Sequence, residues 1–365
     1  MGYNHKADPR GDFKHVLSPT PPPFSPCVST LSTPSATPQT PKISIVIPVF
    51  NAQSSIKKCL ESCISQSFTA IEILIIDDKG QDNSIAIAQT YARNDPRIRI
   101  IHNPQNIGTF HARIQGIKHA HSPYICFLDA DDYLHPNTAM LLSEKLSCFA
   151  KDHQGVSPDI IYFGTSFFPP SCNRLAPKPI TQDTFGAQIL KKSFLAPSTP
   201  PWHIWAKLYK KDFLQKANDK FAHITQKLIM AEDALHSFVI ATLAHSSTGI
   251  TDKLYYYCEN TSSITRRSDP KTRATKIAHL QKIIYYLQTL QEDKDLSSHP
   301  YFHQAHDKIC NILNAAIELE HRYDDTTTYI PAYLKACFSS LKHYHKWQTY
   351  ARIFIFIASL GKIKI

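Results

Sequence analysis

Three carboxylates stand almost side by side in the tetrad Asp129-Ala130-Asp131-Asp132, directly after the apolar run at residues 124–128. Carboxylates this close repel one another unless a cation, hydrogen-bond donors or protonation offsets their charge. Mg²⁺ and Mn²⁺ prefer oxygen ligands of this kind. We therefore expect a divalent metal site here, although aspartates are also common in turns and at helix N-termini.

The elements that must position this tetrad follow from hydrophobic patterning. Continuous apolar runs predict strands, and stretches with helical periodicity alternate with them. The predicted strands are 42–47, 71–76, 98–101 and 124–128, and the predicted helices are 56–65, 85–91 and 108–120. Strands without polar alternation are buried on both faces, so the sequence predicts an α/β fold with a mostly parallel, Rossmann-like sheet and helices on both faces.

Polar side chains follow three of these predicted strands. Asn51 comes after the first, Asp77 and Asp78 close the second, and the tetrad follows the strand at 124–128. Ligands in open α/β sheets bind outside the carboxyl ends of the strands. We therefore expect these groups to meet at one site.

The pattern weakens after about residue 150. A strand is expected at 160–163, a proline-containing loop at 169–179, and little regular structure up to residue 201. A helical run returns at 234–243. Helical periodicity from residue 274 onward, strongest at 277–290 and 306–319, predicts a helical C-terminal appendage.

Composition divides the chain into three predicted regions. The first 41 residues hold nine prolines and ten Ser or Thr, so residues 1–40 are predicted to be disordered. Residues 41–268 form the predicted α/β domain, and residues 269–365 the helical region. No apolar stretch approaches about 18 residues, and the nine scattered cysteines suggest reduced thiols, so a cytoplasmic protein without a membrane span is expected.

The formal net charge of +10 indicates an anionic partner such as a nucleotide phosphate, anionic lipid or nucleic acid. Residues 331–365 contain six Lys or Arg, no Asp or Glu, and several aromatic residues. This pattern suits a segment at the inner face of the cytoplasmic membrane better than nucleic acid. A terminal helix docked on the body with a solvated basic face is the alternative.

Four sequence motifs, taken together, indicate a protein family more specifically than any one of them alone. They are Pro48-Val49-Phe50-Asn51, the run from Asp77 to Ser84, Asn106-Ile107-Gly108 with Arg113, and the tetrad. In this order and spacing they resemble the GT-A nucleotide-sugar transferases of glycosyltransferase family 2, over roughly residues 42–267.

The resemblance implies a donor site. Pro48, Phe50, Asn51 and Asp78 would hold the nucleobase and ribose, with uridine as the first choice, and Arg113 would hold the nucleotide portion. The family often has Asn where this chain has Ile114. A helix cap with a turn is the alternative role for Asp77 and Asp78, and a solvated helix position is the alternative for Arg113.

The resemblance also implies a metal site. Asp131 would bind Mn²⁺ or Mg²⁺ directly, and Asp129 would contact the ribose or complete the metal site through water. The donor phosphates and water would complete the octahedron. Asp132 would support the two ligands.

The acceptor side follows from the same resemblance. In Met230-Ala231-Glu232-Asp233, Asp233 would be the general base beside Glu232, although both acids could instead favour a helix dipole. Trp205 would support the acceptor sugar ring or lie in the core. The predicted diphosphate clamp is Arg266 or Arg267, with a solvated basic turn as the alternative.

These roles predict an inverting, metal-dependent glycosyltransferase that moves a sugar from a nucleoside diphosphate onto a surface-glycan or lipid-linked acceptor. A nucleotidyltransferase is disfavoured because residues 48–54 contain no glycine, and an aspartyl phosphohydrolase because the first strand ends in Asn51. A non-catalytic nucleotide-sugar binder or scaffold protein of a glycan-assembly complex is the remaining alternative.

Overall fold

The computed structural model describes residues 40–170, 176–259, 269–324 and 331–363. Residues from Thr40 onward form one compact unit. The disorder predicted for the N-terminal tail and the phosphate clamp predicted at Arg266 and Arg267 lie outside the described residues.

The first half of the unit alternates strands and helices, as the apolar runs predict. Its elements are β1 (Ile43–Val49), α1 (Ile56–Ile64), β2 (Ile71–Asp77), α2 (Ser84–Ala92), β3 (Ile98–His102), α3 (Thr109–His119) and β4 (Tyr124–Phe127). Each predicted strand and helix of this region is present, and the observed ends differ from the predicted ones by at most two residues. Local apolar runs therefore determine this half of the fold.

The second half is less regular and contains elements that the patterning did not predict. It comprises β5 (Tyr133–Leu134), α4 (Thr138–Asp152), β6 (Ile160–Phe168), β7 (Thr184–Phe185), α5 (Gln188–Phe194), β8 (Lys207–Lys210), α6 (Lys211–Asp219), α7 (Glu232–Leu243) and β9 (Ser246–Cys258). The 13-residue β9 was missed because its exposed middle, around Thr251 to Lys253, interrupts the apolar pattern.

The nine strands of the described residues belong to one sheet with the order β3-β2-β1-β4-β8-β6-β9-β5, and β7 pairs with β9. The four strands β3, β2, β1 and β4 pair in parallel. In the remainder, β6 and β9 are parallel, and the pairings of β8, β5 and β7 are antiparallel. The predicted α/β class is confirmed, and parallel pairing dominates only in the first half.

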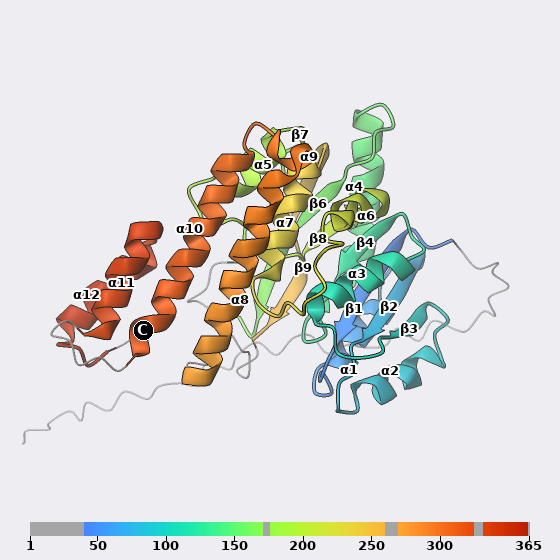
Figure 1. The fold of residues 1–365 in the computed structure, drawn as a ribbon. Helices are drawn as coiled ribbons and strands as arrows, with labels where there is room; N and C mark the ends of the chain where they lie inside the picture. The colour runs from blue at the N-terminus through green and yellow to red at the C-terminus, as the bar shows by residue number, and fades with distance from the viewer. Residues whose placement is uncertain (1–39, 171–175, 260–268, 325–330, 364–365) are drawn as a thin grey trace, which may run out of the picture. The chain divides into compact units, whose positions relative to one another are not determined.

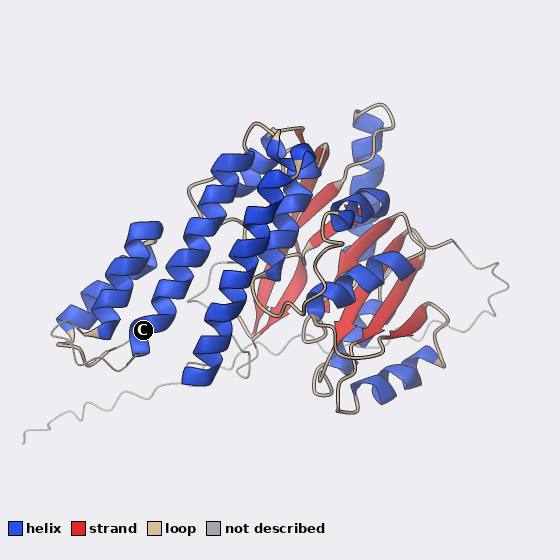
Figure 2. Ribbon diagram, in the orientation of Figure 1, coloured by secondary structure: helices blue, strands red, loops and turns tan. Residues whose placement is uncertain are grey.

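Side chains of the parallel strands alternate between two cores. On β1, Ile45 and Ile47 point to the side covered by α1 and α4, whereas Val46 points to the side covered by α3, α7 and α8. Figure 2 shows helices on both sides of the strands. Burial on both faces explains why these strands read as continuous apolar runs.

Helices follow the sheet, as predicted for the C-terminal region. They are α8 (Pro270–Thr289), η2 (Leu290–Glu292), α9 (Lys294–Ser297), α10 (Phe302–Glu320), η3 (His321–Tyr323), α11 (Ala332–His343) and α12 (Trp347–Ala358). Helices α8 and α10 share a core with α5 and α7, whereas α11 and α12 enclose a small separate core (Figure 1). No helix among the described residues is both long and apolar enough to cross a bilayer.

Candidate active site

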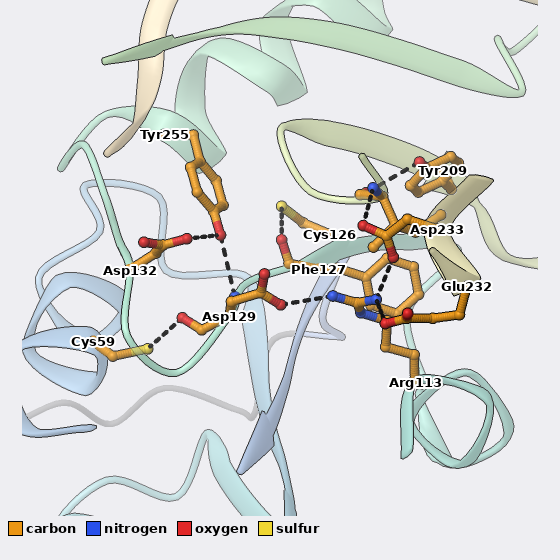
Figure 3. A network of polar contacts seen from close by, with 11 residues as sticks. Cys59, Arg113, Cys126, Phe127, Asp129, Asp132, Tyr209, Glu232, Asp233 and Tyr255 are labelled. Atoms are coloured by element: carbon orange, nitrogen blue, oxygen red, sulfur yellow. Dashed lines mark hydrogen bonds and ion pairs between the residues drawn. The ribbon is translucent and has the colours of Figure 1, made fainter. Parts of the chain in front are cut away.

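Arg113, on helix α3, joins two acidic elements that lie far apart in the sequence (Figure 3). Its Nη1 donates to Oδ1 of Asp233 at 2.6 Å, and its Nη2 donates to Oδ1 of Asp129 at 2.8 Å. Oε1 of Glu232 lies 3.8 Å from Nη1. The structure therefore brings the Asp-x-Asp and Glu-Asp elements together around one buried guanidinium.

Charge compensation keeps this guanidinium ionised. Burial alone would lower the pKa of Arg113, but the carboxylates of Asp233 and Asp129 raise it above its ordinary value. Its side chain is 4% exposed, so few water molecules can replace these partners. The solvated position given as the alternative for Arg113 is therefore wrong, since the side chain is the centre of an ion-pair network, and its nucleotide contact stays a prediction.

The packing of α3 against β1 determines where Arg113 lies. Gly116 faces Val46 so closely that a Cβ atom there would lie 2.2 Å from Val46 Cγ1. Gly108 precedes the helix with φ of 84°, a conformation that glycine adopts without strain. The two glycines together let α3 start abruptly and lie close to the sheet.

Asp78, at the end of β2, fixes the start of the same helix. Its carboxylate accepts hydrogen bonds from Asn103 Nδ2 at 3.0 Å, Ile107 N at 2.8 Å and Gly108 N at 2.9 Å. A carboxylate offers about four acceptor positions. Three bonds leave room for about one more donor, so a nucleobase contact by Asp78 stays a prediction.

The turn after β1 is held by the loop after β2. Asn51 has a left-handed backbone with φ of 50°, and its Oδ1 accepts from Gln81 N at 2.8 Å. Phe50, which precedes it, is half exposed, and the Lys227 ammonium lies 5.6 Å from its ring centre. Pro48 lies within β1, opposite Ile76. An exposed aromatic ring beside polar loop groups is suited to stack on a nucleobase, which is the predicted role of this turn.

The three aspartates of the tetrad have different environments. Asp132 is buried and accepts from Tyr255 Oη and from Cys258 N, both at 2.6 Å. Burial, with the charges of Asp129 and Asp131, raises the pKa of Asp132 to about 8. Tyr255 Oη also accepts from the Asp129 amide at 3.3 Å. Asp132 thus fixes the backbone of the tetrad to β9, the supporting role predicted for it.

Asp129 and Asp131 are the carboxylates that could hold a divalent cation. Asp131 is exposed, and the Asp129 side chain is a quarter exposed with its Oδ1 bound to Arg113. No group of three metal-ligating His, Cys, Asp or Glu side chains exists within the described ranges. Two hard oxygen donors fit Mg²⁺ or Mn²⁺ if phosphate oxygens and water supply the other ligands.

Glu232 and Asp233 begin helix α7 after Ala231, which has a left-handed backbone with φ of 58°. Burial raises the pKa of Asp233, against the opposing effect of Arg113, and its Oδ2 accepts from Ile204 N at 3.4 Å. Burial and the charge of Asp233 raise the pKa of Glu232 to about 7. A carboxylate with a raised pKa is a stronger base, as the predicted role of Asp233 requires.

Trp205 lies in a stack of aromatic rings near the tetrad. Its ring centre is 4.1 Å from that of His203 and 4.8 Å from that of Tyr255, with both pairs close to parallel. The side chain is partly exposed, so it belongs neither wholly to the core nor wholly to the surface. Through Tyr255 it adjoins the hydrogen bonds of Asp132, and its contact with an acceptor sugar stays a prediction.

Lys207 is a buried cation near Asp233 for which the sequence suggested no role. Its Nζ donates to the carbonyl oxygens of Pro201, at 3.1 Å, and His203. Burial lowers the pKa of Lys207 to about 7, whereas the charge of Asp233 opposes that shift. Its position two residues after Trp205, at the start of strand β8, was the available signal.

His236 lies one turn beyond Asp233 and is packed in the core. Its ring contacts Phe110 and Phe221 edge-on, at 5.6 and 5.3 Å between ring centres. Burial, with the charge of Arg113, lowers the pKa of His236 to about 3. It therefore fills space behind the site as a neutral ring, which agrees with the structural role that a lone helical histidine usually has.

The sheet order and the loops at its carboxyl ends define a GT-A fold, the class predicted from the motifs. The solved structure of residues 1–349 of TarS from S. aureus superposes with a TM-score of 0.54 at 18% identity, covering 88% of each chain. At this identity the comparison shows a shared fold.

Residues 44–198, somewhat less than half of the chain, match the model of glycosyl transferase family 2. The chain is 32% identical over 232 residues to the uncharacterized glycosyltransferase EpsJ of Bacillus subtilis (strain 168), covering 62% of this chain and 63% of that relative. It is 45% identical over 97 residues to the uncharacterized glycosyltransferase YibD of Escherichia coli (strain K12), covering 27% and 28%. The chain thus aligns with less than two thirds of either relative.

Proposed function

We propose that this protein transfers a sugar from a nucleoside diphosphate to a hydroxyl group of a surface-glycan or lipid-linked acceptor, with inversion at the anomeric carbon. The observation that carries the proposal is the guanidinium of Arg113, bound to Asp129 on one side and Asp233 on the other. A metal-binding aspartate and a basic carboxylate in one place are what such a transfer needs.

Asp233 would act on the acceptor. As the acceptor oxygen bonds to the anomeric carbon, the bond from that carbon to the diphosphate breaks, and the acceptor proton passes to Asp233. Inversion requires the hydroxyl and the diphosphate on opposite faces of the sugar, so the base and the metal-binding aspartate must be separate groups. Arg113 binds these two carboxylates through different nitrogen atoms and compensates their charge.

Asp131 and Asp129 would hold Mn²⁺ or Mg²⁺ together with the donor phosphates. The bound cation would neutralise the charge that builds on the departing diphosphate. The predicted diphosphate contacts of Arg266 and Arg267 belong to the same proposal. If the metal role is correct, Asp131→Ala loses metal-dependent donor binding, whereas Asp252→Ala, which removes another exposed aspartate, keeps it.

Uridine diphosphate sugars are the donors that we favour, with residues 48–51 and Asp78 on the nucleoside side. TarS, which shares the fold, has been crystallised in complex with UDP-GlcNAc and with UDP. A thermal-shift panel of nucleoside diphosphates and their sugars with Mn²⁺ tests this choice, because a ligand of the native state raises the melting temperature. A larger shift with a guanosine or cytidine nucleotide than with UDP would overturn the uridine assignment.

Product analysis tests the reaction class. We expect the free nucleoside diphosphate and a glycosylated acceptor whose anomeric configuration, read by NMR, is opposite to that of the donor. Release of pyrophosphate would instead indicate a nucleotidyltransferase, and release of phosphate a hydrolase. Donor binding without turnover across a panel of acceptors would favour the non-catalytic binder.

A further inference from the structure

Helix α12 presents a stripe of large apolar side chains to the surface. Trp347, Tyr350, Phe354 and Ile357 recur at intervals of three and four residues, so they share one helical face. They are 73%, 49%, 73% and 56% exposed. Leu360, just after the helix, is 87% exposed. Single exposed apolar residues are ordinary, but a continuous stripe on one face marks an interaction surface.

The opposite face of α12 is the one that docks on the protein. Phe356 stacks on Tyr333 of α11 with 4.7 Å between ring centres, and Ile353 packs on the same small core with Cys337. The helix is therefore held in place by one face while the stripe is left uncovered in the compact unit. The docking named as the alternative in the sequence is thus present, and the membrane contact stays a prediction that concerns the uncovered face.

Basic residues flank the stripe in the sequence. Residues 331–365 carry six Lys or Arg and no Asp or Glu. Lys342 and Lys362, which lie before and after α12, are exposed. The segment thus combines an apolar helical face with basic residues and no acidic ones. This pattern is typical of helices that lie in the interface of an anionic membrane.

We propose that α12 binds the surface of an anionic lipid bilayer, with the apolar stripe inserted at the boundary between headgroups and acyl chains. A second copy of this chain is a poorer occupant, because a symmetric contact through this face would bring the basic groups of both copies together. The proposal goes beyond sugar transfer and does not depend on it.

Flotation of the full chain with lipid vesicles tests the proposal. The chain should bind vesicles of phosphatidylglycerol mixed with phosphatidylcholine, bind phosphatidylcholine alone more weakly, and lose affinity as salt rises. The double variant Phe354→Ser with Ile357→Ser should lose at least about 100-fold in affinity for the mixed vesicles, since each buried side chain contributes to insertion. Tyr285→Ser, which removes an exposed aromatic of α8, is the matched control and should bind as the wild type does.

A variant without two of the lysines tests the electrostatic contribution to membrane binding separately. Lys342→Gln with Lys362→Gln should weaken binding to the mixed vesicles by about 30-fold, at about 1 kcal/mol per lysine, and leave binding to phosphatidylcholine unchanged. Failure of the wild type to float with mixed vesicles, or equal flotation of the serine variant, would overturn the proposal. So would a wild-type dimer, seen by light scattering, that the serine variant abolishes, because the stripe would then be a contact between copies.

Discussion

The parallel half of the sheet consists of β3, β2, β1 and β4, and the mixed half of β8, β6, β9, β5 and β7. In the parallel half, functional side chains are held by backbone amides of neighbouring loops. In the mixed half, they are held by buried ions. Asp78 and Asn51 accept hydrogen bonds from N–H groups of adjacent loops. Asp233 and Lys207 instead lie in a buried charged cluster. Neutral N–H donors stabilise the charge of a carboxylate without a second ion. In a buried ion pair, the loss of one partner leaves the other charge uncompensated, which is strongly destabilising.

The two halves should therefore respond differently to substitution. Substitutions in the parallel half should remove single hydrogen bonds and leave the remaining polar groups solvated or bonded. Substitutions in the mixed half should leave a buried charge without compensation. Arg113 belongs to the first half by its helix and to the second by its partners, so its removal should have the largest effect on stability.

Arg113→Met should lower the free energy of unfolding by about 3–5 kcal/mol, because Asp129, Asp233 and Glu232 lose their shared cation. Urea denaturation measures the loss. Arg97→Met, which removes a more exposed arginine paired with Asp95, is the control and should cost about 1 kcal/mol. An equal loss of unfolding free energy in the two variants would show that the buried carboxylates do not depend on Arg113 for charge compensation.

Asp78→Asn should lower the free energy of unfolding by about 1–3 kcal/mol, since an amide cannot accept from Asn103, Ile107 and Gly108 together. The start of α3 should loosen as a result, and faster amide hydrogen exchange at Gly108 would show it. Unchanged exchange there would mean that the glycine and its packing alone fix the helix start.

Lys207 supplies an effect that changes with pH, in contrast to the fixed losses above. Burial lowers its pKa to about 7 in the folded protein, whereas an unfolded lysine titrates near about 10.4. Between these values the unfolded chain binds more protons at this site, so the stability of the wild type relative to Lys207→Met should rise with pH. The slope should not exceed about 1.4 kcal/mol per pH unit.

Urea denaturation of both proteins at several pH values between about 7 and 10 measures this slope. Lys57→Met, which removes an exposed lysine of α1, serves as the control and should follow the wild type. A stability difference independent of pH would show that Lys207 is charged in the folded protein throughout this range.

The same contrast explains what the sequence could predict. The strands β1 to β4 and helices α1 to α3 follow from local apolar runs, and the end of each strand marks a polar loop. The aspartates of the tetrad and Asp233 were found by motif. That Arg113 would contact both acids could not be predicted, because it depends on the register of α3 against β1 and on Gly116.

The mixed half of the sheet was harder to predict, because its strands pair with strands that are distant in the sequence. Strand β9 pairs with β6, β5 and β7, and its exposed middle hides the apolar pattern. The burial of Lys207 and the stack of His203, Trp205 and Tyr255 result from these pairings. Local periodicity carries no information about such contacts.

Sugar transfer by Asp233→Asn, with donor affinity measured by calorimetry on the same samples, tests whether Asp233 is the general base. Loss of a general base should lower kcat by about 10²–10⁴-fold while donor affinity stays within a few-fold of the wild type. Glu232→Gln, its neighbour on α7, should reduce kcat far less. Transfer by Asp233→Asn at the wild-type rate would show that Asp233 is not the general base.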